Sequence, residues 1–324
     1  MTRPRCFPEM GRYFQRAPAT PLVPVQLDAS LPAIWCKLEF LNPSGSAKDR
    51  IARHILEKAW RSGLLSQGSW VVEASSGSTS IALALACAQL DLRFLAVMPE
   101  GVSNERVLTI RAYGGEVLAL PKSLGMAGAI ARAEQEARER GGLATRQFEN
   151  PDNPDAHRLG TAQEVLGQIP GGRVDAVVSG VGTGGTLVGL FEGCQQGGCH
   201  ARPFAARPLA HGFMADLECC SFSARIPGVL DGVSRLYTPQ RLPGLAIVDV
   251  DDEVALQASR ELIRHGFPVG PSSGLNYAAA VVAARTLPAD SFVVTVFPDR
   301  MDRYFSTELF DPFRQSTKEE TVPL

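Results

Sequence analysis

The chain has 324 residues, 45% apolar and 20% charged, and its 32 basic and 34 acidic side chains leave a formal charge of −2. This composition is typical of a globular protein with room for two modest domains, and it argues against a main role in binding nucleic acid or an anionic membrane. No apolar stretch reaches the ~20 residues of a membrane helix, and the first ten residues lack the apolar core of a secretory signal. We therefore expect a cytoplasmic protein without nucleic-acid or membrane partners.

Short apolar runs alternate with amphipathic segments, a pattern that predicts an α/β fold with mostly parallel sheets flanked by helices. A polar stretch at residues 150–155 (NPDNPD) indicates a crossing between two lobes. The predicted strands are residues 70–74, 93–98, 116–120, 174–179, 245–250 and 292–297. The clearest predicted helices are residues 49–61, 104–113, 126–140 and 253–265.

Seven cysteines, an odd number in a chain without a secretory signal, indicate reduced thiols and not a disulfide framework. Cys194, Cys199, His200 and His211 are the group that could suggest zinc. Their spacing matches no common zinc pattern, and the chain has no CxxC pair. We therefore predict no metal site.

Residues 42–50 (NPSGSAKDR) predict a turn that ends in a lysine at a helix start. A cation is disfavoured at this positive end of a helix, so Lys48 is more easily neutralised than a surface lysine. A neutral amine is what Schiff-base chemistry requires. From this segment alone, a solvated surface lysine remains the alternative interpretation.

Two further turns carry hydroxyl groups at predicted helix starts. Residues 73–80 (EASSGSTS) follow a predicted strand and would direct several N–H groups and hydroxyls to one point, which suits a carboxylate or a phosphate. Residues 270–276 (GPSSGLN) lead into the apolar helix YAAAVVAA. In both segments, a serine that simply caps the helix is the alternative interpretation.

Residues 180–186 (GVGTGGT) predict a backbone turn around an anion, with hydroxyls from Thr183 and Thr186. The segment also satisfies the G-x-G-x-x-G pattern of dinucleotide sites. Such a site needs an acidic residue about 20 positions further on, where this chain offers Arg207 instead. A lone phosphate therefore fits better than NAD, whereas NADP is not strictly excluded. The P-loop spacing is absent.

In their order along the chain, the four segments resemble those of the cysteine synthase and cystathionine β-synthase family of fold-type II pyridoxal-phosphate (PLP) enzymes. Further matching segments are TPLV at 20–23, MPEGVSNER at 98–106, RQFENPDNPDAH at 146–157 and VTVFPDRMDRYFST at 294–307, so the resemblance runs nearly end to end. The resemblance implies a two-lobed α/β fold like that of the tryptophan synthase β subunit. Residues 43–153 would form the smaller, mobile lobe that binds the substrate carboxylate. Residues 1–42 plus 154–324 would form the larger lobe that anchors PLP.

The resemblance also implies which residues bind PLP. Lys48 matches the lysine that forms the internal aldimine, and Ser272 matches the serine that hydrogen-bonds the pyridine nitrogen. Because a neutral hydroxyl does not keep that nitrogen protonated, the ring would favour α,β-elimination over transamination. The phosphate cup corresponds to Gly182, Thr183, Gly184, Gly185 and Thr186.

The resemblance also implies the residues that bind the substrate. Ser75, Ser76, Gly77 and Thr79 would hold its α-carboxylate with the help of Gln147, and Gly228 would be a further substrate-binding residue. The resemblance implies that an O-activated L-serine, such as O-acetylserine, replaces Lys48 on PLP and loses its α-proton to the freed lysine. An α-aminoacrylate forms, and sulfide adds to it to give L-cysteine. Closure of the smaller lobe would exclude water.

The chain departs from the family pattern at a few positions near the expected substrate. Ser78 stands where the family usually has an asparagine that reaches the PLP O3′ atom, so that bond would be lost or bridged by water. Ser80 and Leu230 replace usual glycines, and Asp231 adds a carboxylate that could serve as a second acid or base. For Asp231, a surface-loop aspartate is the alternative interpretation. These differences bear on the donor and the nucleophile more than on PLP.

Several alternatives keep the same chemistry with another donor or nucleophile: O-phosphoserine, homocysteine, or an amine that gives 2,3-diaminopropionate. Others are a net β-elimination, as in a cysteine desulfhydrase or a serine dehydratase, or a catalytically impaired homologue that acts as a binding protein. The intact Lys48 and glycine loop argue against the last of these. The family further implies a homodimer and a contact with a serine acetyltransferase.

Overall fold

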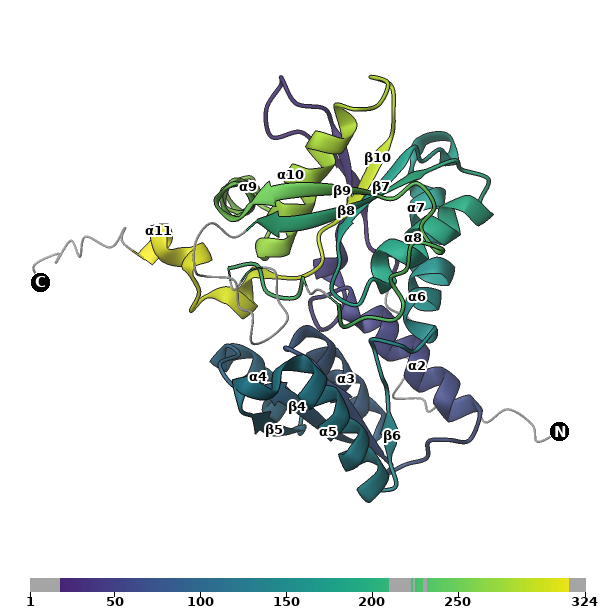
Figure 1. Cartoon of the computed structure of the whole chain (residues 1–324), viewed down its shortest axis with the longest axis vertical. Helices are drawn as coiled ribbons and strands as arrows, with labels where there is room; N and C mark the ends of the chain where they lie inside the picture. Colours follow the sequence, from purple (N-terminus) through teal and green to yellow (C-terminus); the bar gives the residue numbers. More distant parts are fainter. Residues whose placement is uncertain (1–17, 210–222, 224, 230–231, 315–324) are drawn as a thin grey trace, which may run out of the picture.

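The computed structural model describes residues 18–209, 223, 225–229 and 232–314, which form two β-sheets with helices on both faces of each (Figure 1). The four-stranded sheet lies in the lower part of Figure 1 and the six-stranded sheet in the upper part. The chain begins in the six-stranded sheet, forms the four-stranded sheet, and then returns to complete the larger one. None of the helices in the described ranges is long and apolar enough to span a membrane.

The four-stranded sheet is parallel throughout, with the order β5-β4-β3-β6. Its elements are β3 (Trp70–Ala74), β4 (Arg93–Pro99), β5 (Glu116–Leu120), β6 (Leu143–Ala144), α2 (Lys48–Arg61), α3 (Ser78–Leu90), α4 (Asn104–Ala112) and α5 (Gly125–Glu139). Side chains alternate along a strand, so Val71 packs on the side of α2 and α3 while Val72 packs on the side of α5. Because both faces of β3 and β4 are buried, these strands have nearly continuous apolar sequences.

The six-stranded sheet has the order β1-β2-β10-β7-β8-β9, and only the pair β1–β2 is antiparallel. One face packs against α9 and α10, and the other packs against α7 and α8. The strands are β1 (Leu22–Val25), β2 (Ile34–Lys37), β7 (Ala176–Gly180), β8 (Arg202–Leu209), β9 (Ala246–Asp251) and β10 (Val293–Val296). The helices of this part are α6 (Asp152–Ala156), α7 (Ala162–Gln168), α8 (Gly185–Gln196), α9 (Asp252–Arg264), α10 (Pro271–Ala284) and α11 (Asp311–Arg314).

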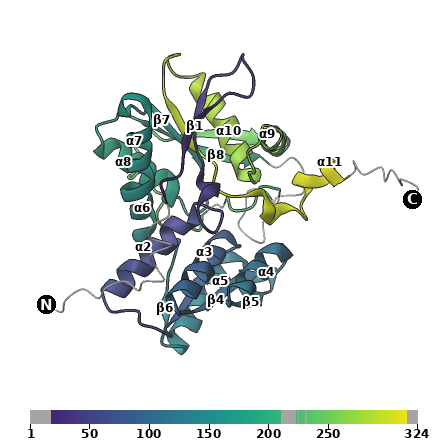
Figure 2. The same ribbon diagram turned by 180° about the vertical axis from the view of Figure 1, so that it is seen from behind.

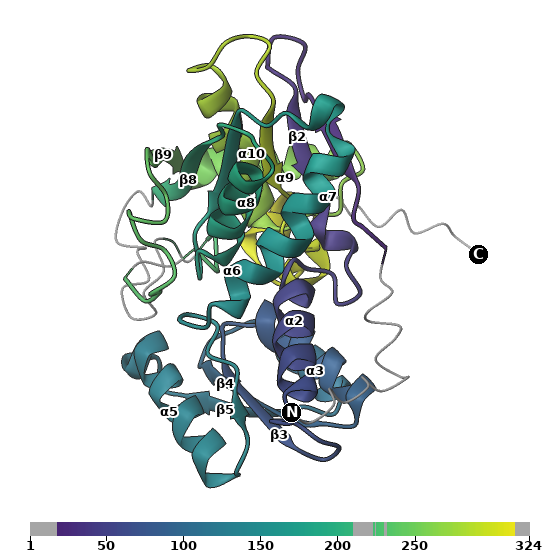
Figure 3. The same ribbon diagram turned by 90° about the vertical axis from the view of Figure 1, so that its right-hand side faces the viewer.

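Helix α2 lies at the junction of the two sheets, as Figures 2 and 3 show from two directions. Its first turn is held by Arg50, whose guanidinium donates to both carboxylate oxygens of buried Glu39 at 2.6 and 2.7 Å and to Glu164 at 2.7 Å. Burial alone would raise the pKa of Glu39, but the charge of Arg50 and the hydrogen bonds from Arg50 and Thr20 together outweigh burial and lower that pKa to about 2. The start of α2, which carries Lys48, is therefore fixed to the larger part of the molecule.

The α/β prediction is confirmed, and each predicted strand and helix is present with its ends shifted by no more than two residues. Residues 150–155 lie where the chain passes from β6 into α6 and the helices that cover the six-stranded sheet. The strands β1, β2 and β6 were not predicted, because segments of four, four and two residues carry too little pattern. The division into a mobile and an anchoring lobe stays a prediction.

Candidate active site

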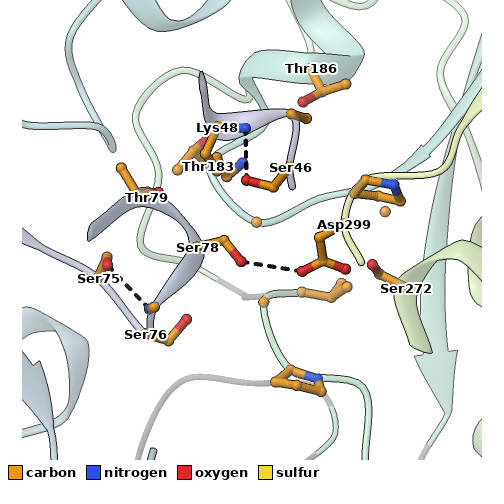
Figure 4. A pocket seen from close by; sticks show the side chains of 18 of the residues that line it. Ser46, Lys48, Ser75, Ser76, Ser78, Thr79, Thr183, Thr186, Ser272 and Asp299 are labelled. Atoms are coloured by element: carbon orange, nitrogen blue, oxygen red, sulfur yellow. Dashed lines mark hydrogen bonds between the residues drawn. The ribbon is translucent and has the colours of Figure 1, made fainter. Parts of the chain in front are cut away.

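A pocket lies between the two sheets, at the carboxyl ends of strands β3, β7 and β10 (Figure 4). This is where parallel α/β sheets usually bind ligands. The pocket has about 930 Å³ of empty space including its open mouth, within the size range of small-molecule sites. All the predicted site residues except Gly185 line it: Lys48, Ser75, Ser76, Gly77, Ser78, Thr79, Gln147, Gly182, Thr183, Gly184, Thr186, Gly228 and Ser272.

Lys48 is the first residue of α2 and faces the pocket. Its backbone N–H donates to the hydroxyl of Ser46 at 3.3 Å, which fixes the turn before the helix. Burial lowers the pKa of the Lys48 amine, and the negative charge of Asp299 partly opposes this effect. The amine is therefore more readily neutral than that of an exposed lysine, as its position in the sequence predicted.

The loop between β3 and α3 is held together by the hydroxyl of Ser75. This oxygen accepts hydrogen bonds from the backbone N–H groups of Gly77 at 3.1 Å and Ser80 at 3.2 Å, and it lies 2.6 Å from the Ser80 hydroxyl. Ser80 is fully buried and does not line the pocket described here. The serine at position 80, where the family usually has glycine, therefore binds Ser75 and does not form part of the pocket wall.

Gln147 and Thr79 form the side of this loop. The Thr79 hydroxyl donates to the side-chain oxygen of Gln147 at 2.6 Å, and the Gln147 amide nitrogen donates to the carbonyl of Ala74 at 2.7 Å. Buried Glu73 supports them, because its carboxylate accepts from the backbone N–H of Gln147 at 3.0 Å and from the Thr145 hydroxyl at 2.6 Å. Burial raises the pKa of Glu73 to about 7 against these hydrogen bonds.

The loop between β7 and α8 has the geometry of a phosphate site. The N-cap residue of α8 supplies no side-chain cap. The N–H of Gly185 makes a long hydrogen bond of 3.4 Å to the Thr183 hydroxyl, and the next backbone N–H groups of the helix are available to an anion. A Cβ on Gly182 would lie 2.3 Å from the carbonyl oxygen of Gly228, and Gly184 has a φ of +80°, so neither position accepts a side chain. The hydroxyls of Thr183 and Thr186 complete the cradle. The backbone of this loop can therefore approach a phosphate group closely.

Gly185 lies beneath this loop, against Asn153. A Cβ on Gly185 would be 1.9 Å from the Asn153 side-chain oxygen, so only glycine fits there. The amide nitrogen of Asn153 donates to the Gln147 carbonyl at 2.7 Å and to the Thr183 hydroxyl at 2.9 Å. Asn153 thus connects the loop at 182–186 with the segment that carries Gln147, a role that was not predicted from the sequence.

His157 supports the same loop from the other side. One ring nitrogen lies 3.2 Å from the Thr186 hydroxyl and the other 2.9 Å from the Thr161 hydroxyl. Burial lowers the pKa of His157 to about 3, with a smaller opposing effect of Glu39. The imidazole is therefore neutral and acts as a hydrogen-bonding support for Thr186.

A second unpredicted group surrounds Ser78. Its hydroxyl donates to a carboxylate oxygen of Asp299 at 3.2 Å and accepts from the Arg303 guanidinium at 3.0 Å. The same Asp299 oxygen accepts from the Tyr304 hydroxyl at 2.7 Å, and the other has no partner among the described residues. Ser78 is thus engaged by protein groups where the family's asparagine is expected to reach PLP. Leu230 and Asp231 lie outside the described residues.

Comparison with known proteins agrees with this geometry. The sequence profile of the family described as pyridoxal-phosphate dependent enzyme matches residues 14–299. This chain belongs to that family. It is accordingly a PLP-dependent enzyme of the transferase or lyase type, and its two mostly parallel sheets are the fold-type II architecture predicted from the sequence.

Two curated relatives of this PLP-dependent enzyme are similar over most of their length. A cysteine synthase of Staphylococcus aureus is 36% identical over 300 residues, which cover 90% of this chain and 94% of the relative. An O-ureido-L-serine synthase of Streptomyces lavendulae is 36% identical over 297 residues, which cover 90% of each chain.

Solved structures are similar to this chain over nearly their whole length. A crystal structure of O-ureido-L-serine synthase matches with a TM-score of 0.83 and 33% identity, covering 94% of this chain and 96% of the other. A crystal structure of an O-acetylserine dependent cystathionine β-synthase from Helicobacter pylori matches with a TM-score of 0.81 and 30% identity, covering 93% and 98%. The similarity therefore extends over both sheets and the pocket between them.

Proposed function

We propose that the chain catalyses PLP-dependent β-replacement on an O-activated L-serine, with an O-acetylserine-like donor and sulfide as nucleophile, giving L-cysteine. The observation that carries the proposal is the convergence of a partly buried lysine, a hydroxyl-lined loop and a glycine loop on one pocket. The relatives described as cysteine synthase and O-ureido-L-serine synthase support the choice of a serine derivative as donor.

Within this proposal, the residues present fit PLP. Gly182, Thr183, Gly184, Gly185 and Thr186 would hold the phosphate on backbone N–H groups and hydroxyls, and Ser272 would bind the pyridine nitrogen. Lys48 would bind the aldehyde carbon, since burial favours its neutral, nucleophilic amine. When bound, PLP supplies the electron sink that makes an α-proton of the substrate acidic.

The substrate itself would be oriented by the loop at 75–79. Its backbone N–H groups and hydroxyls, with Gln147 beside them, suit the α-carboxylate. The substrate amine would first take the place of the Lys48 amine on the aldehyde carbon, which frees the lysine. The Lys48 amine would then accept the α-proton, the β C–O bond would break, and the leaving group would depart with the electron pair. Sulfide would form the new β C–S bond, and Lys48 would return its proton to the α-carbon and displace the product amine from the aldehyde carbon. The lysine therefore ends in its initial state.

We further propose that residues 43–153 close over the substrate as a mobile lobe and exclude water during these steps. The segments between the two sheets, β6 to α6 and the start of α2, are where such a movement would be accommodated. A homodimer, a contact with a serine acetyltransferase and a cytoplasmic location stay predictions. Light scattering of the purified protein at dilute concentration tests the first of them.

A donor scan tests the proposed function. The PLP-loaded protein receives O-acetyl-L-serine, O-phospho-L-serine, L-serine and L-cysteine in separate experiments, and the absorption spectrum of the cofactor is followed. We expect O-acetylserine to change the spectrum, and subsequent sulfide to restore it with formation of cysteine, measured by chromatography.

Each other outcome changes the proposal in a defined way. A response to O-phosphoserine alone replaces the donor, and a response to cysteine with release of sulfide favours β-elimination. If no compound changes the spectrum of a protein that retains PLP, the β-replacement proposal fails and a binding homologue is favoured.

A further inference from the structure

Besides Lys48, one cationic side chain of the candidate active site has no anionic partner among the residues that the structure describes. Arg106, the third residue of α4, lines the pocket and is only 7% exposed. Its Nε atom is buried without a hydrogen-bond partner, and the guanidinium makes no hydrogen bond or ion pair with any residue in the described ranges. Such a group destabilises the protein, because burial removes water and supplies no replacement.

The side chain of Arg106 lies against the loop that we propose for the substrate carboxylate. A Cβ on Gly77 would be 2.3 Å from the Cδ atom of Arg106, so the arm of Arg106 fills the space that a side chain at position 77 would need. The guanidinium then lies over the ring of Tyr304, with 5.0 Å between its Cζ atom and the ring centroid. Arg106 is therefore held between this loop and Tyr304.

Two carboxylates of this region, Asp299 and Glu105, make their hydrogen bonds with residues other than Arg106, and the second oxygen of Asp299 has no partner among the described residues. Asp299 accepts hydrogen bonds from Tyr304 and Ser78, and Glu105 accepts from the backbone and side chain of Ser306 at 3.0 Å. Arg303, the other buried arginine in this region, is occupied by Ser78 and by the carbonyl of Ser44. Apart from Lys48, which is proposed to bind the cofactor, Arg106 is therefore the cationic side chain of the pocket that the described residues leave for an anionic ligand.

We propose that Arg106 binds an anionic group of the amino-acid substrate, through carboxylate or phosphate oxygens. This inference rests on the proposed function, since it takes the substrate to be a serine derivative. Such a substrate has two groups of this chemistry: the α-carboxylate and, in a phosphorylated donor, the phosphate on the side-chain oxygen. The planar guanidinium presents paired N–H donors that suit either group.

The test compares variants of the PLP-loaded protein. Arg106→Gln removes the charge, Arg106→Lys keeps the charge without the forked donors, and Arg111→Gln changes an exposed arginine of the same helix as a control. Dissociation constants are measured from the cofactor absorption with O-acetyl-L-serine, O-phospho-L-serine and the amide of O-acetyl-L-serine, which lacks the α-carboxylate. PLP content and melting temperature are recorded for each variant.

We expect Arg106→Gln to weaken the binding of an anionic donor by about tenfold or more, since a hydrogen bond to a charged group is lost. Weaker binding of both acids with unchanged binding of the amide assigns the α-carboxylate, and a loss confined to O-phosphoserine assigns the phosphate. The Arg106→Lys variant should lose less affinity for the anionic donor than the Arg106→Gln variant. The Arg111→Gln control should bind each donor with the affinity of the original protein. Unchanged binding of both acids to a folded, PLP-loaded Arg106→Gln protein overturns the proposal.

Failure of the proposed function is separable from failure of this inference. If no donor changes the spectrum of the original protein, the proposed function fails, and inorganic phosphate then tests the anion site without catalysis. A rise in melting temperature with phosphate that is lost in Arg106→Gln supports the site. An equal response in both proteins, or none in either, overturns it.

Discussion

Gly182 approaches Gly228 so closely that a Cβ atom on Gly182 would lie 2.3 Å from the carbonyl oxygen of Gly228. The two residues belong to different segments of the pocket, the proposed phosphate loop and the segment proposed to face the substrate. Their contact couples the position of the phosphate loop to that of the substrate segment. A side chain at position 182 must move backbone, because the atom it meets is a carbonyl oxygen.

We expect Gly182→Ala to lower the affinity for PLP by about tenfold or more and to destabilise the protein by about 1–3 kcal/mol, since overpacking of this kind displaces backbone. Equilibrium dialysis of PLP and thermal unfolding measure the two effects. Gly167→Ala is the matched control, because a Cβ there meets nothing within 4 Å and the residue lies in helix α7. Equal behaviour of the two variants would contradict the coupling.

Lys48→Ala should remove the covalent attachment of the cofactor. Borohydride reduction followed by peptide mass spectrometry is expected to find the cofactor mass on the peptide that contains Lys48 and on no peptide of the variant. Lys58→Ala, in an exposed position of the same helix, should keep the label on Lys48. Labelling of a different lysine in the original protein would contradict the assignment of Lys48 as the residue that binds the cofactor covalently.

Glu73 predicts a pH dependence of stability. Burial raises its pKa to about 7, above the ordinary value of 4.5, so the folded state binds this proton more tightly than the unfolded state. The resulting stabilisation is complete below pH 4.5 and is lost as the pH rises through about 7. The Glu73→Gln variant has no carboxyl group to titrate here, so its free energy of unfolding should not fall in this way. Between pH 4.5 and about 7, the free energy of unfolding of the variant should therefore rise by about 3 kcal/mol relative to that of the original protein.

Denaturant unfolding of both proteins at several pH values gives the difference directly. A difference that stays constant across this range would show that Glu73 does not titrate there. The Thr145→Val variant, which removes one hydrogen bond to the same carboxylate, should raise the pKa of Glu73 further and move the loss to higher pH.

Arg50→Met should destabilise the protein by about 3–5 kcal/mol, because buried Glu39 would be left without its counter-charge. Arg61→Met is the control on the same helix: its ion pair with Glu57 is largely exposed and contributes at most about 1 kcal/mol. Since Arg50 fixes the helix start that carries Lys48, its variant should also bind PLP less tightly. Unfolding in urea and a PLP titration measure both effects.

The parts of the site that could be predicted from the sequence are local. Three short segments, those around Lys48, at 73–80 and at 180–186, each join a turn to a helix start within ten residues of sequence. Their backbone geometry therefore follows from short-range rules. The roles of Asn153 and Arg303 could not be predicted. Asn153 binds Thr183, 30 positions away, and Arg303 binds Ser78, 225 positions away.

The same distinction applies to Ser80 and to the strands that were not predicted. That Ser80 differs from a usual family glycine can be read from the sequence, but the contact of its hydroxyl with Ser75 across the turn cannot. The strands β1 and β2 have only four residues each, and their place in the sheet depends on a partner near the other end of the chain. Motifs therefore identified the pocket, whereas the contacts that hold it came from the tertiary structure.

Strand β10 lies between β2 and β7 in the six-stranded sheet, although among the described strands it is the last in the sequence and so the last of them to be synthesised. During translation, all four strands of the smaller sheet are available once residue 144 has emerged. Strands β2 and β7 each lack a pairing partner on one edge until β10, which lies between them, has been synthesised. Long-range pairing of this kind is slow to form, and the unpaired edges are exposed to association with other chains in the meantime. A nascent chain halted before residue 293 would thus have a complete four-stranded sheet and a six-stranded sheet that lacks its central strand β10. Its exposed strand edges would suit recognition by chaperones.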